Sequence, residues 1–149
     1  MNGNVELLNY IHQNSEMGQD TIKQLVGISK DEEYKKMLQS QLEEYKMIYD
    51  TTDKKIKELN NQAKDINVFS KASTYFMVNL NTLVNKTPSH ISEMLIQGST
   101  MGIVDITKKI KEYPNADKEI LDLANKLLAF EQNNVEECKK YLQWNKKVN

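Results

Sequence analysis

Two polar residues near the end of the chain lie where a helical pattern places apolar side chains. Glu131 and Asn134 are three residues apart on a stripe whose other members include Leu127 and Cys138. That spacing puts both side chains on one face of a helix at adjacent turns. In helical bundles a Glu-x-x-His pair in this spacing supplies two metal ligands, and here Asn stands in the His position. The pair therefore predicts either a metal or ligand site or a hydrogen-bonded polar layer that sets helix register.

A second polar pair occurs near the start of the chain. His12 and Glu16 are four residues apart, so they share one helix face. A carboxylate and an imidazole are both metal ligands, and His12 and Glu16 are candidates to bind a metal together with Glu44 and Glu131. The alternative is a surface ion pair or a hydrogen-bonded core histidine.

The apolar residues repeat at three and four positions through most of the sequence, which predicts helices. Ser29 and Glu32 have the spacing of a capping box, and Thr87-Pro88 is a typical helix start. We expect a short amphipathic helix at 69–83 between two pairs of long helices, which span 4–28, 29–59, 88–113 and 117–144.

The lengths of the connections predict how these helices are arranged. The first two helices are joined by a few residues, and so are the last two, so each pair must fold back into an antiparallel hairpin. Roughly 25 residues separate the hairpins, enough to cross the length of a bundle if part of the path is helical. The sequence predicts an all-α, single-domain four-helix bundle over 1–149 with one long crossover.

Composition excludes several classes of partner. The net charge is -1 and all 20 basic residues are lysine, so the basic face and arginine contacts of a nucleic-acid reader are missing. No apolar run is long enough to span a membrane, and the first residues lack the pattern of a signal peptide. We therefore expect no nucleic acid, no membrane insertion and a cytoplasmic location. The single cysteine, Cys138, excludes an internal disulfide.

Glycines and methionines point to close packing. Gly98 and Gly102 are four residues apart on one helix face, and each costs about 1 kcal/mol relative to alanine inside a helix. We expect them to allow close approach of a neighbouring helix. Gly18 is expected to have the same role on the first helix. Met94 and Met101 flank the glycine pair and are expected to fill gaps in the core.

The step Glu16-Met17-Gly18 and the amphipathic segment Phe69–Leu83 carry a family resemblance. In both features the chain resembles the ferritin-like superfamily, most closely the bacterial ferritin-like domains of unknown function. The resemblance implies a four-helix bundle and a dinuclear iron site. The sequence departs from the metal-binding pattern at Met47 and Asn134, where His is absent, and it lacks the glutamate of the third long helix.

We therefore expect a non-catalytic ferritin-like bundle that acts as a binding, regulatory or structural protein without a cofactor. The exposed apolar residues expected at Tyr75, Met77 and Val78 favour a homo-oligomer, most simply a dimer. The alternative is an iron- or manganese-binding protein or oxidoreductase with an atypical carboxylate site. Under that alternative the metal ligands are Glu16, Glu44, Glu131, Asn134 and His12.

Overall fold

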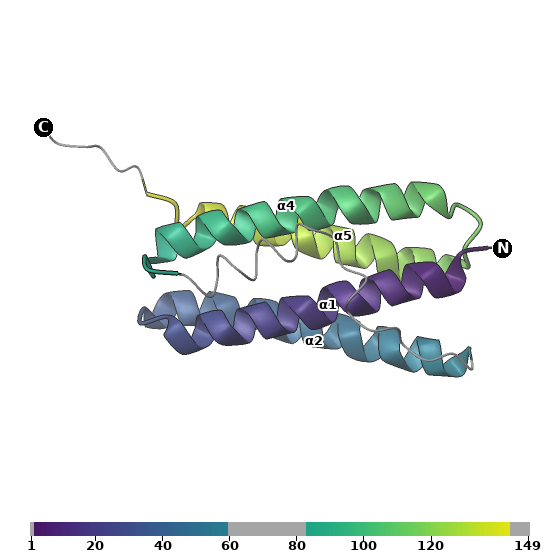
Figure 1. Ribbon diagram of the computed structural model, residues 1–149, viewed down its shortest axis with the longest axis horizontal. Coiled ribbons are helices and arrows are strands. Elements are labelled where there is room, and N and C mark those ends of the chain that lie inside the picture. The colour runs from purple at the N-terminus through teal and green to yellow at the C-terminus, as the bar shows by residue number, and fades with distance from the viewer. Residues whose placement is uncertain (1, 60–82, 144–149) are drawn as a thin grey trace, which may run out of the picture.

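The computed structural model describes residues 2–59 and 83–143, and these form a bundle of helices with no strand among them. Figure 1 shows two antiparallel hairpins lying side by side along a common axis. The four helices are α1 (Asn4–Ile28), α2 (Glu32–Glu58), α4 (Pro88–Glu112) and α5 (Lys118–Lys139). The predicted all-α four-helix arrangement is confirmed at this level.

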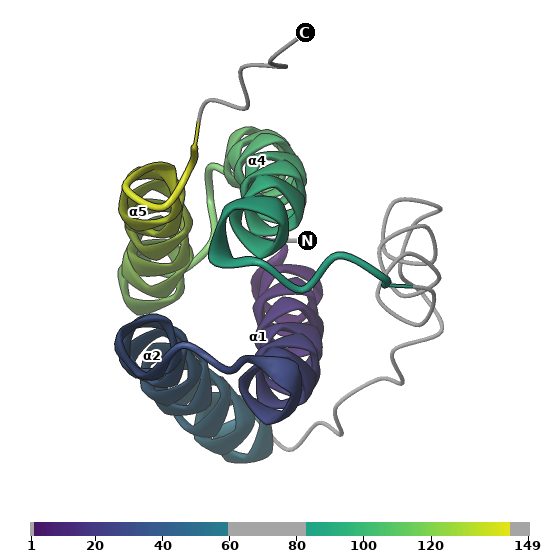
Figure 2. The ribbon, with the colours of Figure 1, turned by 90° about the vertical axis from the view of Figure 1, so that its left-hand side faces the viewer.

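The two hairpins pack against each other along their length. Viewed end-on in Figure 2, α1 lies beside α2 and α4, and α5 lies beside α4 and α2. Helices α1 and α5 also contact each other across the bundle. In Figure 1, α2 ends at one end of the bundle and α4 begins at the other. The predicted long crossover therefore joins opposite ends. All but the last residue of the helix predicted at 69–83 lie outside the described residues, and so do Tyr75, Met77 and Val78.

The core consists of the apolar stripes that the sequence predicts. Fully buried branched side chains from all four helices meet along the bundle axis, which is how amphipathic helices gain stability. The largest of them are Leu7, Leu8, Ile11, Ile22, Leu25, Leu38, Ile48, Ile56, Ile91, Ile106 and Ile120. Met94 is buried with them as expected. The expectation for Met101 is wrong: it is 41% exposed, because it lies on the solvent side of the α4 stripe.

The helix ends show how local chemistry sets the elements. Thr87 caps α4 as predicted, since its hydroxyl accepts a hydrogen bond from the backbone N–H of His90 at 3.2 Å. The predicted cap of the second helix is wrong. Asp31 is the N-cap of α2, because its carboxylate accepts from the N–H of Tyr34 at 2.9 Å. Ser29 instead ends α1, donating its N–H to the carbonyl of Leu25.

The last helix is shorter than predicted. Helix α5 ends at Lys139 rather than near residue 144, and residues 140 and 141 form a turn. Among the described residues, no helix is both long and apolar enough to cross a lipid bilayer.

Candidate functional site

The centre of the bundle holds a buried carboxylate. Glu131 of α5 is only 2% exposed, and its Oε1 accepts a 2.8 Å hydrogen bond from the hydroxyl of Tyr45 on α2. The predicted inward orientation of Glu131 is therefore confirmed. The hydrogen bond links the two hairpins, because α2 belongs to the first and α5 to the second.

Burial dominates the acid–base behaviour of this carboxyl. Removal from water raises the pKa of Glu131 to about 7, although the hydroxyls of Tyr45 and Ser99 act to lower it. The same burial, together with the Glu131 charge, raises the pKa of Tyr45 well above its usual value. Tyr45 therefore acts as a hydrogen-bond donor at neutral pH, and Glu131 is divided between its protonated and ionised forms.

Packing on both sides fixes the ring of Tyr45. One side is an edge-on contact with Phe130, with ring centroids 4.7 Å apart. The other side is the backbone of Gly18 on α1, where a Cβ atom would lie only 2.5 Å from Cε1 of Tyr45. Gly18 thus permits the close approach predicted from the sequence, and the partner in that approach is an aromatic ring.

Polar groups from all four helices surround Glu131. We call this set the polar layer, and its members are Asn14 (α1), Tyr45 (α2), Ser99 (α4), Glu131 and Asn134 (both α5). Gly102 of α4 borders it: a Cβ there would lie 3.5 Å from Cδ of Glu131 and 3.6 Å from Nδ2 of Asn14. Because those are ordinary contact distances, Gly102 leaves methyl-sized room beside the carboxyl.

Two members of the polar layer carry atoms that lack a hydrogen-bond partner. Asn134 is 2% exposed and lies beside the hydroxyl of Tyr45, but neither its Oδ1 nor its Nδ2 makes a hydrogen bond of normal geometry among the described residues. The Oε2 atom of Glu131 is likewise buried and without a hydrogen bond there. A buried polar group without a hydrogen bond costs about 1–3 kcal/mol.

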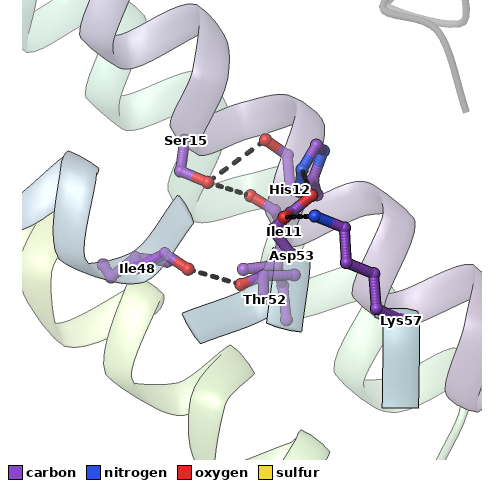
Figure 3. Close-up of polar contacts among 7 residues, drawn as sticks. All are labelled: Ile11, His12, Ser15, Ile48, Thr52, Asp53 and Lys57. Atoms are coloured by element: carbon purple, nitrogen blue, oxygen red, sulfur yellow. Dashed lines mark hydrogen bonds and ion pairs between the residues drawn. The ribbon is translucent and has the colours of Figure 1, made fainter. Parts of the chain in front are cut away.

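A second polar cluster joins α1 to α2, as Figure 3 shows. Nε2 of His12 lies 3.1 Å from Oδ1 of Asp53, and Nζ of Lys57 lies 2.8 Å from Oδ2 of the same carboxylate. Lys57 and His12 hold the pKa of Asp53 below its usual value, so the carboxylate is ionised and can only accept. Nε2 of His12 therefore carries a proton and donates it in this hydrogen bond.

The rest of this cluster is structural. The His12 ring packs on that of Tyr49, with centroids 4.3 Å apart. The hydroxyl of Ser15 donates to the carbonyl of Ile11 at 2.6 Å, and that of Thr52 donates back along α2 in the same way. Because the Ser15 hydroxyl is bound to backbone, Ser15, His12 and Asp53 do not make a nucleophile–base–acid relay.

The structure brings together only part of the predicted metal set. Glu131 and Asn134 lie together in the polar layer, whereas His12 pairs with Asp53 in the second cluster. Glu16 and Glu44 are half-buried, and Glu16 raises the pKa of Tyr49 together with burial. Within residues 2–59 and 83–143, no group of three or more His, Cys, Asp or Glu side chains is placed to hold a metal ion.

The position of Met47 removes the other half of the expected Glu-x-x-His pattern. Met47 is 51% exposed, and its sulfur faces Nζ of Lys126 at the surface. A histidine at position 47 would therefore lie at the surface and not beside Asn134. The donors around Glu131 are hydroxyls and amides, and a dinuclear site needs several carboxylates, so the described residues do not fit a dinuclear metal centre.

The buried thiol behaves as a core residue. Cys138 is 1% exposed, and the amide nitrogen of Gln41 lies 3.7 Å from its sulfur. Burial raises the pKa of the Cys138 thiol to about 11, so it stays protonated and unreactive at neutral pH. Nearby, the hydroxyls of Tyr34 and Ser92 lie 2.9 Å apart and satisfy each other.

Sequence reasoning missed several partners in both clusters. Helical spacing places Tyr45 on the buried stripe of α2, but it does not pair Tyr45, Ser99 or Asn14 with Glu131. Asp53 lies one position beside the buried Thr52 and carries no local signal. Which of these residues meet depends on how the helices are rotated against each other. The spacing of residues within one helix does not predict that rotation.

Comparison with protein families, with curated proteins and with solved structures finds no match to this chain. The ferritin-like resemblance therefore stays a prediction.

Proposed function

We propose that this chain is a non-catalytic ferritin-like bundle that serves as a binding, regulatory or structural protein, with the dinuclear metal site of that architecture eroded. The observation that carries the proposal is the environment of Glu131. The carboxyl is fully inside the bundle, yet it accepts its hydrogen bond from a tyrosine, and its other polar neighbours are a hydroxyl and amides. Such a set suits hydrogen bonding and helix register.

The course of the helices supports the ferritin-like part of this proposal. Each hairpin is antiparallel, and the crossover joins opposite ends of the bundle, so α2 and α4 run in the same direction (Figure 1). A bundle with simple short connections would place α2 and α4 antiparallel. One long crossover between two hairpins is the connection that ferritin-like folds use.

Metal analysis of the purified protein tests the proposal. We expect less than one equivalent of iron or manganese per chain after the protein has been offered either ion and desalted. About two equivalents per chain would overturn the proposal and favour the metal-binding alternative, which rests on the inward Glu131. Thermal melts with and without a chelator provide a second readout, because a bound metal stabilises the folded form.

A variant of Glu131 assigns any metal that is found. If Glu131 is a ligand, Glu131→Gln releases the metal and lowers the melting temperature of the metal-loaded form only. If Glu131 belongs to a hydrogen-bonded layer, chelator does not change the difference between the variant and the wild type. Glu137→Gln is the matched control, because Glu137 is a half-buried carboxylate on the same helix and lies outside the predicted metal set.

Assembly into a homodimer stays a prediction. Light scattering on the purified chain would give the mass directly, and a mass of one chain across the micromolar range would contradict it.

A further inference from the structure

The polar layer contains three buried atoms that need a partner. They are Oε2 of Glu131, Oδ1 of Asn134 and Nδ2 of Asn134, and none has a hydrogen bond among the described residues. Both side chains lie on α5 at adjacent turns of one face, so a single occupant between them can reach all three. Buried polar atoms without a protein partner usually bind an ordered internal molecule.

The chemistry of the three atoms restricts what that occupant can be. Oδ1 of Asn134 accepts a hydrogen bond and Nδ2 donates one, whichever way the amide is turned. An occupant that satisfies both must therefore donate and accept. A metal cation can only attract acceptors, so it would leave Nδ2 of Asn134 unpaired. An apolar occupant would leave all three atoms unpaired.

The packing also limits its size. Gly102 carries no side chain toward the carboxyl, and a Cβ placed there would already lie 3.5 Å from Cδ of Glu131 and 3.6 Å from Nδ2 of Asn14. The layer is therefore closely packed on this side, and its occupant has to be small. The core is otherwise closed by large side chains such as Ile106, Leu127 and Phe130.

We propose that the polar layer binds one long-lived internal water molecule, which bridges Oε2 of Glu131 and the side-chain amide of Asn134. The water donates to Oε2 and to Oδ1, and it accepts from Nδ2. This inference rests on the proposed function, since a metal on Glu131 would take the same oxygen. The bridge makes the eroded site a specific hydrated layer, in which two polar side chains of α5 satisfy each other through the water.

Water relaxation dispersion measured with ¹⁷O counts internal waters that exchange slowly. We expect Asn134→Leu to lose the signal of one long-lived water relative to the wild type. The matched control is Asn125→Leu, which removes an exposed asparagine from the same helix and should leave the signal unchanged. Equal signals in the wild type and in folded Asn134→Leu would overturn the inference.

A measurement on the unmodified chain keeps the test decisive if Asn134→Leu does not fold. In an NMR experiment that transfers magnetisation from water to protein protons, we expect a signal at the side-chain amide protons of Asn134. Its sign should be the one that a long-lived water contact produces. Absence of that transfer means a dry layer, which overturns this inference and leaves the proposed function standing. A metal retained at Glu131 and shown by metal analysis overturns both.

Discussion

The hydroxyl of Tyr45 donates a 2.8 Å hydrogen bond to Oε1 of Glu131, and this contact joins the two hairpins at the centre of the bundle. A hydrogen bond to a buried carboxyl group is worth more than one at the surface, because water cannot replace it. The Tyr45 ring is held by Phe130 on one side and by Gly18 on the other. Rotation of α5, close approach of α1 and the state of Glu131 are therefore linked through one aromatic side chain.

Replacing Gly18 by alanine should destabilise the bundle. The new methyl group would overlap the Tyr45 ring at 2.5 Å, so the ring must move and its hydrogen bond to Glu131 must lengthen. We expect a loss of about 1–3 kcal/mol in the free energy of unfolding, measured by urea denaturation. Gly27→Ala is the matched control on the same helix, because no atom lies within 4 Å of its added Cβ. It should gain up to about 1 kcal/mol from helix propensity. A stabilised Gly18→Ala would contradict this packing.

The pKa of Glu131 predicts a specific pH dependence of stability. Its folded value of about 7 exceeds its ordinary value of 4.5, so the folded protein binds the proton more tightly than the unfolded chain. This contribution is fully present below about pH 4.5 and is lost as the pH rises through 7. Glu131→Gln removes it while keeping the side-chain shape. Relative to wild type, we expect the variant to gain about 1–3 kcal/mol between pH 5 and pH 8. If the free energies of unfolding of the two proteins change with pH in the same way, the prediction is wrong and Glu131 is in contact with solvent.

Large side chains at position 102 should not be tolerated. A leucine there must extend beyond its Cβ toward the buried carboxyl of Glu131, which already lies 3.5 Å from that Cβ. We expect Gly102→Leu to cost about 1–3 kcal/mol by overpacking. Gly102→Ala adds only a methyl group at ordinary contact distance and should lie within about 1 kcal/mol of wild type. Urea midpoints decide, and a neutral Gly102→Leu would place this face of α4 away from the polar layer.

Asp53 should contribute more to the stability of the bundle than is usual for a partly exposed carboxylate. Asp53→Ala leaves the buried Nε2–H of His12 without its acceptor, and an unsatisfied buried donor costs about 1–3 kcal/mol. Lys57→Ala removes the other partner of the same carboxylate, but Lys57 is largely exposed, so that change should cost less than about 1 kcal/mol. Thermal melts at pH 7.5 compare the two. An equal loss of stability in the two variants would contradict the prediction, because it would mean that the buried hydrogen bond to His12 contributes no more than the exposed ion pair to Lys57.

Some of this structure follows from the sequence because it depends on neighbouring residues alone. The cap at Thr87 and the end of α4 near residue 113 are local events, and both were predicted at the right place. The start of α2 shows the limit of such reasoning. Ser29 and Asp31 are both good caps, and the choice between them was made by α1, whose last turn uses the N–H of Ser29.

The inward orientation of Glu131 and Asn134 follows from the sequence, because the apolar stripe of α5 has to be buried and they lie on it. Which residues surround them depends on the packing of the four helices. Tyr45 and Asn14 come from other helices, and their distance from Glu131 depends on the rotation and offset between helices. The same packing also determines that Met47 faces solvent and that His12 pairs with Asp53. Periodicity fixes a face within one helix, whereas contacts between helices arise from the packing of whole surfaces.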